Sequence, residues 1–514
     1  MNPTDEQSII VRASKTKCSL KVSAFAGTGK TTTFILIAKA MPETQFLYLA
    51  FNKAIATEAT AKFRAAGAFN VLVKTAHALA YAAVGRDFSH RLEMRRWTVM
   101  KAIEQRFASD ISSIATGRKM QYDAVQAIIE TVRSFEASSD PEITEDHVPA
   151  DTPVSAKRVL RVARNVWDAM ADVNDDLPVT HDTYFKLWAL TNPTLRWDSL
   201  FFDEAQDASP VMLGVVEKQT AMQRIFVGDT HQSIYSFRKA VDAIESIDLP
   251  MLPLTQSWRF GKNIAALANT ILAIKGEPLT LRGNPAIEDT VASGLETLPD
   301  AILARTNAGL FEEALELLPL DVPFGVVGGA DEVCDTVEAA YNVYAYGKSD
   351  HASFKFFSSW EALTEASESR QGASYKPFVK IVELHKHSIP ALCKSVRERV
   401  VDPAQAKVIL STVHKFKGGE RPHVRIANDF NPFCFFDYRI KQWVWLPEEA
   451  NVQYVALTRA MKTLEVRQYA DILAASIANR TKMLEQESRY ESRLTVTAGG
   501  ASWSSKRSAP PAAS

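Results

Sequence analysis

The chain has few cysteines and no cysteine motif. Its four cysteines stand apart in the sequence, with none of the paired spacings of a metal-binding or redox site; they are Cys18, Cys334, Cys393 and Cys434. This pattern disfavours a zinc site, an iron–sulfur cluster or a disulfide framework, and it suits a reducing compartment. With 514 residues the chain is long enough for several domains with large apolar cores.

The chain also lacks a long apolar run. Its amino terminus is polar, and no stretch approaches the roughly 20 apolar residues that cross a bilayer. We therefore expect a cytoplasmic protein that does not associate with membranes.

A net excess of charge is missing too. The sequence has 59 Lys and Arg against 60 Asp and Glu, a formal net charge of −1. This balance argues against a uniformly basic surface for nucleic acid, but a local basic groove stays open because binding depends on local charge density. Three basic clusters are present, and each is also open to interpretation as a solvated helix face. They are Arg86, Arg91, Arg95, Arg96 and Lys101; Lys157, Arg158, Arg161 and Arg164; and Lys376, Lys380, Lys386, Lys394, Arg397 and Arg399.

Short apolar runs alternate with helical patterns, which predicts an α/β protein with parallel sheets. The expected strands of the first unit are residues 21–25, 45–51, 70–74, 199–203 and 223–228, with helices at 31–40 and 54–66. A second α/β pattern has expected strands at residues 301–304, 324–327, 407–412 and 423–427. Each pattern is interrupted by a mainly helical insertion. After about residue 480 the chain drifts to Ser, Ala, Gly and Pro, which predicts a disordered tail.

Two segments of the first unit point to phosphate chemistry. Residues 24–31, with the sequence AFAGTGKT, predict a glycine-rich turn between a strand and a helix whose backbone N–H groups cradle phosphate. Lys30 would lie against the β and γ phosphates, and Thr31 would offer a hydroxyl to Mg²⁺. The acidic pair Asp203 and Glu204 follows an apolar strand, so Asp203 is a candidate Mg²⁺ ligand and Glu204 a candidate for polarising the attacking water.

Three further side chains are candidates for the same chemistry. Gln232 follows another apolar strand and could sense the γ-phosphate. Phosphoryl transfer also needs positive charge against the phosphate oxygens. Arg259 and Arg459 could supply it, although the residues alone do not select these two among the arginines of the chain.

With these segments in place, the chain resembles the superfamily 1 DNA helicases of the UvrD/Rep/PcrA type, and within them the F-box DNA helicase group without an F-box. The resemblance covers about residues 3–470 and nearly every motif in order. It implies two RecA-like units that share an ATP site with Mg²⁺. The implied nucleotide contacts are Gln7 to adenine, Trp258 stacked on adenine, Glu420 to the ribose, and Ala26, Gly27, Thr28, Gly29, Lys30, Thr31, Thr32, Arg259 and the arginine finger Arg459 to the phosphates.

The same resemblance implies a path for single-stranded DNA. The implied contacts are Phe51, Asn52, Lys53, Thr75, His77, Tyr235, Phe237, Arg238, Thr412 and His414. Three positions depart from the family pattern, namely Lys239, Gly419 and the pair Arg421-Pro422. These departures bear on DNA coupling more than on ATP chemistry.

The domain organisation that follows has five parts. A RecA-like domain 1A spans residues 1–85 and 175–252 with a helical insertion 1B at 86–174. A RecA-like domain 2A spans residues 253–345 and 405–480 with a small insertion 2B at 346–404, and a tail follows at 481–514.

The expected function is an ATP-dependent 3′→5′ DNA helicase and translocase in DNA repair, recombination or replication. Its expected partners are single-stranded and partial-duplex DNA and recombination or replication proteins. We expect a monomer, associated with the nucleoid if the source is bacterial. The alternatives are a translocase that strips recombinase filaments with little unwinding, an ATP-gated scaffold that does not hydrolyse ATP, and a P-loop kinase. The intact Lys30, Glu204, Gln232 and Arg459 argue against the scaffold.

Overall fold

The computed structural model describes residues 3–235, 242–351, 353–368, 373–438 and 440–497. The chain divides into two compact units, Met1–Arg259 and Phe260–Ser514. The first unit extends past residue 252, where the sequence analysis ends it, because residues 255–259 bind its amino-terminal part. Thr255 N–H donates to the Glu6 carboxylate (2.9 Å), and Trp258 N–H donates to the Gly27 carbonyl (2.8 Å).

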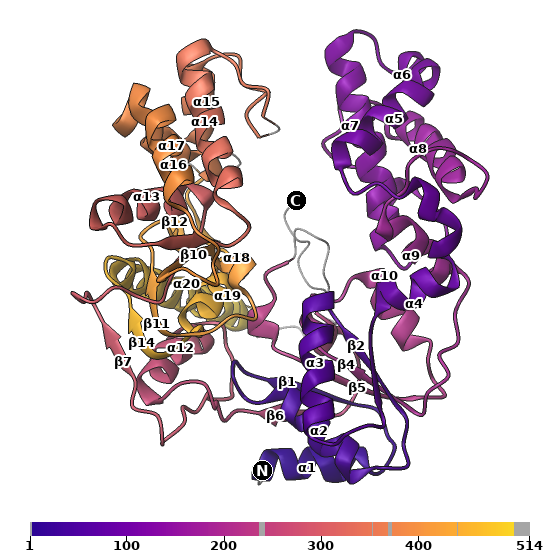
Figure 1. The fold of residues 1–514 in the computed structure, drawn as a ribbon, viewed down its shortest axis with the longest axis vertical. Helices are drawn as coiled ribbons and strands as arrows, with labels where there is room; N and C mark the ends of the chain where they lie inside the picture. Colours follow the sequence, from indigo (N-terminus) through magenta and orange to yellow (C-terminus); the bar gives the residue numbers. More distant parts are fainter. Residues whose placement is uncertain (1–2, 236–241, 352, 369–372, 439, 498–514) are drawn as a thin grey trace. The chain divides into compact units, whose positions relative to one another are not determined.

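The first unit is built on a six-stranded parallel sheet of order β3-β2-β4-β5-β1-β6 (Figure 1). Five of its strands were predicted; the sixth, β6, was not, because Pro253 interrupts its short apolar run. Proline is tolerated there because β6 is an edge strand, where a missing N–H breaks no ladder. The strands are β1 (Leu20–Ala24), β2 (Phe46–Ala50), β3 (Val71–Thr75), β4 (Ser199–Phe202), β5 (Gln223–Gly228) and β6 (Met251–Leu254).

Helices cover this sheet and bury its apolar side chains. Phe34 of the helix that follows β1 packs on Phe201 (ring centroids 4.5 Å apart), which stacks on Phe46 (4.4 Å). The helices are α1 (Asp5–Ser14), α2 (Lys30–Ala40), α3 (Lys53–Ala65), α4 (Ala76–Ala83), α9 (His181–Leu190), α10 (Pro210–Glu217) and α11 (Ala243–Ser246).

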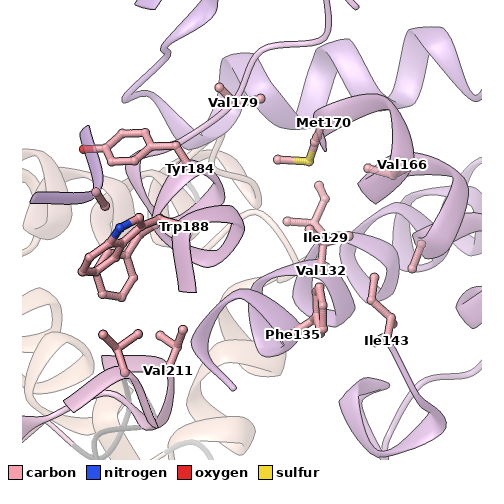
Figure 2. Close-up of a cluster of buried hydrophobic side chains, with 14 of the residues drawn as sticks. Ile129, Val132, Phe135, Ile143, Val166, Met170, Val179, Tyr184, Trp188 and Val211 are labelled. Carbon is pink, nitrogen blue, oxygen red and sulfur yellow. The ribbon is translucent and has the colours of Figure 1, made fainter. Parts of the chain in front are cut away.

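The insertion of the first unit is helical, as predicted. Its helices are α5 (Arg96–Arg106), α6 (Ala108–Ile114), α7 (Arg118–Ala137) and α8 (Ala156–Ala171). Helix α8 buries one stripe and leaves its basic residues exposed, the pattern of an amphipathic helix. Figure 2 shows Val166 and Met170 of α8 near Ile129 and Val132 of α7, within a core that also takes in Trp188 of α9.

The second unit has its own six-stranded parallel sheet, of order β7-β14-β11-β8-β10-β9. Four of its strands were predicted, and the sheets together confirm the predicted α/β class. The short edge strand β7 and the charged strand β14 gave no clear apolar run. The strands are β7 (Thr290–Ala292), β8 (Ala301–Ala304), β9 (Phe324–Val326), β10 (Val408–Thr412), β11 (Arg421–Ile426) and β14 (Ala460–Glu465), with a separate antiparallel hairpin of β12 (Cys434–Asp437) and β13 (Gln442–Trp445).

The helices of the second unit include the predicted small insertion. They are α12 (Lys262–Ile274), α13 (Asn307–Leu317), α14 (Ala330–Tyr346), α15 (Trp360–Ser367), α16 (Lys376–His385), α17 (Ile389–Arg399), α18 (Val413–Phe416), α19 (Pro447–Leu457) and α20 (Tyr469–Thr497). Cys334 of α14 and Cys393 of α17, far apart in the sequence, face each other in this core, and each Sγ lies within 4 Å of the other residue's carbonyl oxygen (3.7 and 3.9 Å).

The predicted disordered tail is wrong up to Thr497. Helix α20 continues through that residue. Residues 481–497 are rich in Leu, Met, Glu, Gln and Arg, which favour helix, and the drift to Ser, Ala and Gly begins only after them. Residues 498–514 lie outside the described part of the chain. Among the described residues, no helix is long and apolar enough to cross a membrane.

Candidate active site

The loop between β1 and α2 has the geometry of a phosphate cradle. Gly27 (φ +74°) and Gly29 (φ +83°) take left-handed conformations that favour glycine, and α2 begins at Lys30. The N-cap residue of α2 is Gly29, which has no side chain to cap the helix. The first backbone N–H groups of a helix have no partner within the helix and carry the positive end of its dipole. This end of α2 therefore suits an anion such as phosphate.

Residues 255–259 pack directly against this loop. A Cβ atom at Gly27 would lie 2.6 Å from Ser257 Oγ and 2.7 Å from Arg259 Cβ, so only glycine fits. The backbone of Trp258 is fixed on Gly27, while its ring is exposed. The structure thus brings two predicted nucleotide contacts, Trp258 and Arg259, to the loop.

Gln7 lies beside the same loop. It is buried, and it forms a capping box with Thr4 at the start of α1. Its side-chain Nε2 donates to Thr33 Oγ1 of α2 (3.2 Å) and would lie 3.4 Å from a Cβ atom at Gly29. The predicted adenine contact therefore lies next to the glycine loop.

A partly buried ion pair joins the loop to the acidic pair. Lys30 Nζ lies 2.9 Å from Glu204 Oε1. Burial lowers the pKa of Lys30, but the carboxylates of Glu204, Asp203 and Asp229 outweigh burial and raise it above its ordinary value. Lys30 is therefore charged, and its partners are the acidic residues that follow β4 and β5.

Asp203 lies in surroundings with an excess of negative charge. Burial, and then the neighbouring Glu204, raise its pKa to about 6, although Lys30 and the hydroxyl of Tyr48 favour its charged form. A divalent cation would relieve this repulsion, and carboxylate and hydroxyl oxygens are ligands that Mg²⁺ prefers. Asp203 and Thr31 thus fit a Mg²⁺ ion by the chemistry of their donors.

A chain of hydrogen bonds continues from Glu204 to Gln232. Gln206 Nε2 donates to Glu204 Oε2 (2.6 Å), and Gln206 Oε1 accepts from Asp229 N–H (2.9 Å). Gln232 Nε2 in turn donates to Asp229 Oδ2 (2.7 Å). The structure brings together the predicted Lys30, Glu204 and Gln232.

Tyr48, Gln206 and Asp229 were assigned no role from the sequence, although Gln206 and Asp229 lie within the segments that carry Glu204 and Gln232. Asp229 carries a usable signal, because it directly follows β5 and the carboxyl ends of parallel strands meet at one sheet edge. Tyr48 lies in the middle of an apolar strand and gives no such signal. Gln206 is identifiable only from its contacts.

The described DNA contacts that were predicted in the first unit lie at or just after the carboxyl ends of β2, β3 and β5. The rings of Phe51 and Tyr235 stack with centroids 5.9 Å apart and planes 13° apart. His77 Nε2 lies 3.4 Å from Asp182 Oδ1, and its ring stacks on Phe185 (4.6 Å).

The other predicted DNA contacts of this unit have simpler surroundings. Asn52 and Thr75 cap α3 and α4, while Lys53 is exposed on the first turn of α3. Phe237 and Arg238 lie outside the described residues, as does the departure at Lys239.

In the second unit, the predicted site residues gather around the loop after β10. Thr412 caps α18, His414 is half-buried on that helix, and Glu420 is exposed. Arg459 is buried, and its guanidinium donates to the carbonyls of Val455 (2.9 Å) and Gly419 (3.5 Å) and to Thr458 Oγ1 (3.2 Å).

The basic clusters divide into different kinds of contact. Arg91 is buried and donates to main-chain carbonyls, among them that of Leu177 (2.8 Å), so it is structural. Arg397 of the third cluster pairs with Asp335 and Glu338 of α14. The second cluster, on α8, is exposed.

Two helicase family models and two curated helicases are similar to this chain. The UvrD/REP helicase N-terminal domain matches residues 3–247, and the UvrD-like helicase C-terminal domain matches residues 355–470. The chain is 30% identical over 502 residues to "F-box DNA helicase protein 1" of Schizosaccharomyces pombe (90% of this chain, 57% of that protein). It is 32% identical over 500 residues to "F-box DNA helicase 1" of Gallus gallus (89% of this chain, 48% of that protein).

The chain therefore spans about half the length of the curated relatives that it matches. Its two units each hold a parallel sheet, and the two family models together cover more than half of the chain. The chain belongs to the UvrD-like helicases.

Proposed function

We propose that this protein is an ATP-dependent DNA helicase that moves 3′→5′ along single-stranded DNA and unwinds duplex. The observation that carries the proposal is the partly buried ion pair of Lys30 and Glu204 beside the buried Asp203, at the start of α2. A lysine and two carboxylates at a glycine loop match the needs of phosphoryl transfer, where positioning and charge stabilisation supply most of the catalysis. The relatives' names, which include "DNA helicase", support DNA as the track.

The residues of the first unit have separate roles in this proposal. The N–H groups at the start of α2 and the Lys30 ammonium bind the β and γ phosphates, and Gln7 and Trp258 bind the base. Thr31 and Asp203 would hold Mg²⁺, which would supply positive charge against the phosphate oxygens. Glu204 orients and polarises the attacking water.

Further groups are proposed to contact the negatively charged γ-phosphate. Arg259 lies beside Gly27 of the glycine loop. Gln232 is tied through Asp229 and Gln206 to Glu204, which suits a sensor of the γ-phosphate. Arg459 of the second unit is proposed as the arginine finger, with Glu420 as the ribose contact.

The DNA track is proposed along the loops after β2, β3 and β5 and around α18. Stacking of a base on an aromatic ring is worth about 1–3 kcal/mol and tolerates any sequence. Phe51 and Tyr235 already stack on each other, so they offer a shared aromatic platform. A role in repair, recombination or replication is part of the proposal.

The test is the ATP turnover rate with and without single-stranded DNA, followed by unwinding of partial duplexes that carry a 3′ or a 5′ tail. We expect turnover that rises with single-stranded DNA and unwinding only from the 3′ tail. Turnover that ignores DNA, or unwinding from the 5′ tail, would contradict the proposal.

A second candidate is a translocase that strips recombinase filaments and unwinds poorly. It is favoured by the irregular start of β11, where the pairing register with β14 shifts between Arg421 and His423, at the departure Arg421-Pro422. A strand-displacement assay beside a protein-displacement assay separates the two candidates. Efficient filament removal with little unwinding would select the translocase.

A further inference from the structure

Gln206 connects the two catalytic segments of the first unit. We propose that Gln206 is a positioning residue, which holds the Glu204 carboxylate in place for the attacking water and ties it to the segment that carries Gln232. The inference rests on the proposed function, because it assigns a further residue to the proposed ATP hydrolysis.

The contacts of Gln206 fix the orientation of its side chain. Gln206 is fully buried. Its Oε1 must face Asp229 N–H (2.9 Å), because a backbone N–H can only donate. Its Nε2 therefore faces the carboxylates of Glu204 (2.6 Å) and Asp207 (3.2 Å), and donates to both. Each polar atom of the amide has a partner of opposite character.

The backbone of β5 and of the segment after it lies close against Gln206. A Cβ atom at Gly228 would lie 2.5 Å from Gln206 Oε1, so the glycine lets β5 approach the amide. Ser233 Oγ donates to the Gln206 carbonyl (3.1 Å), which adds a second link to the same segment. The region before and after Gln232 is thus bound to Gln206 at two points.

Glu204 needs such support for two reasons. Its backbone is left-handed (φ +52°), a conformation that is unfavourable for residues other than glycine. Its carboxylate also bonds to Lys30 (2.9 Å), whose ammonium is the group expected to bind phosphate. When Lys30 turns to the nucleotide, Gln206 still holds Glu204, so the carboxylate stays directed at the water.

The experiment compares Gln206→Ala and Gln206→Glu with Gln219→Ala as a matched control. Gln219 is a second buried glutamine of the first unit, and its amide accepts from Leu195 N–H (2.9 Å) and donates to the carbonyls of Pro193 (2.8 Å) and Val215 (2.9 Å). It holds main chain and has no link to Glu204 among these bonds. Steady-state kcat and KM for ATP are measured at saturating single-stranded DNA, with the melting temperature of each variant.

We expect Gln206→Ala to lower kcat by about 10–100-fold, the usual effect of removing a residue that orients a catalytic ligand, and to leave KM within about two-fold. Gln206→Glu keeps the acceptor for Asp229 N–H but places a carboxylate against Glu204, so its kcat should fall at least as far. Gln219→Ala should lower the melting temperature and keep kcat.

Three outcomes would overturn the assignment. They are a Gln206→Ala enzyme with wild-type kcat, a Gln206→Glu enzyme with wild-type kcat, and a Gln219→Ala enzyme that loses kcat as much as Gln206→Ala does. Wild-type enzyme without any ATP turnover would overturn the proposed function as well, so the two failures are distinguishable.

Discussion

One strand-to-helix junction of each unit can be compared: β1 to α2 in the first unit, and β8 to α13 in the second. The two junctions differ in how the start of the helix is capped. In the first unit, β1 leads through two left-handed glycines into α2, whose N-cap residue, Gly29, has no side chain to cap the helix. In the second unit, β8 leads into α13, where Thr306 caps the helix and Asp429 accepts from the N–H groups of Arg305 (2.8 Å) and Thr306 (2.7 Å).

The difference shows what each junction is for. The Asp429 carboxyl group is a hydrogen-bond acceptor that the chain itself supplies. Burial raises its pKa, and the hydrogen bonds from Arg305 and Thr306 partly offset that rise. A Cβ atom at Gly309 would overlap its carboxylate, so the second junction is filled. The first junction instead has Lys30 on its first helical residue and two acidic residues opposite. We call it the open junction, and we propose that it binds the phosphates of a nucleotide.

The largest expected effect comes from removing the charge at the open junction. Lys30→Ala should lower kcat for ATP by about 10³-fold, the scale of losing a main electrostatic contact to the transferred phosphoryl group, with the fold retained. Coupled ATPase and near-UV circular dichroism measure the two quantities. Near-normal turnover in this variant would remove the distinction between the two junctions.

A smaller effect is expected from the excess negative charge at the open junction. The pKa of Asp203 is raised in the folded protein to about 6, from an ordinary value of 3.8. The stability that it contributes is complete below about pH 4 and is lost as the pH rises through about 6, a change of about 3 kcal/mol. Urea unfolding of wild type and Asp203→Asn between pH 4 and 7.5 measures it.

In that experiment the wild type should lose stability relative to Asp203→Asn as the pH rises. A difference between the two proteins that does not vary with pH would show that Asp203 ionises normally, and that the open junction carries no unrelieved charge.

At the filled junction, the expected effect is on stability alone. Asp429→Ala removes the acceptor of two partly buried backbone N–H groups and of the Thr306 hydroxyl, so we expect a loss of about 2 kcal/mol in the free energy of unfolding. ATP turnover per folded molecule should stay at the wild-type rate. Urea titration and active-site titration provide the two readouts, and a stable variant that no longer hydrolyses ATP would refute a purely structural role.

The smallest effect is expected at the helix cap beside it. Thr306 Oγ1 accepts from Gly309 N–H (3.0 Å), so Thr306→Ala should cost about 1 kcal/mol, the usual contribution of an N-cap. The same urea titration detects it. A cost as large as that of Asp429→Ala would mean that Thr306, and not the carboxylate, closes the junction.

Most strands and the main residues of the first junction could be predicted from the sequence. The apolar strands, the glycine loop and the acidic pair after β4 are local patterns, and the structure places Lys30, Glu204 and Gln232 in one hydrogen-bonded network. The strands that were missed in the two parallel sheets lack a clean apolar run: β6 contains Pro253, β7 has three residues, and β14 is charged.

The contacts that come from distant segments could not be predicted. Asp429 follows β11 by a few residues and reaches the start of α13 only because β11 and β8 are neighbours in the sheet. Tyr48 reaches Asp203 because β2 and β4 are paired. The sequence spacing of Cys334 and Cys393 does not indicate their contact, because the contact depends on the packing of α14 on α17.

The most direct test of the account measures ATP turnover, with Mg²⁺ and single-stranded DNA, in wild type, Lys30→Ala and Asp429→Ala side by side. With the ATP site at Lys30, we predict DNA-stimulated turnover in the wild type and in folded Asp429→Ala, and almost none in Lys30→Ala. Turnover that survives in Lys30→Ala, or that is absent from the wild type, would contradict it.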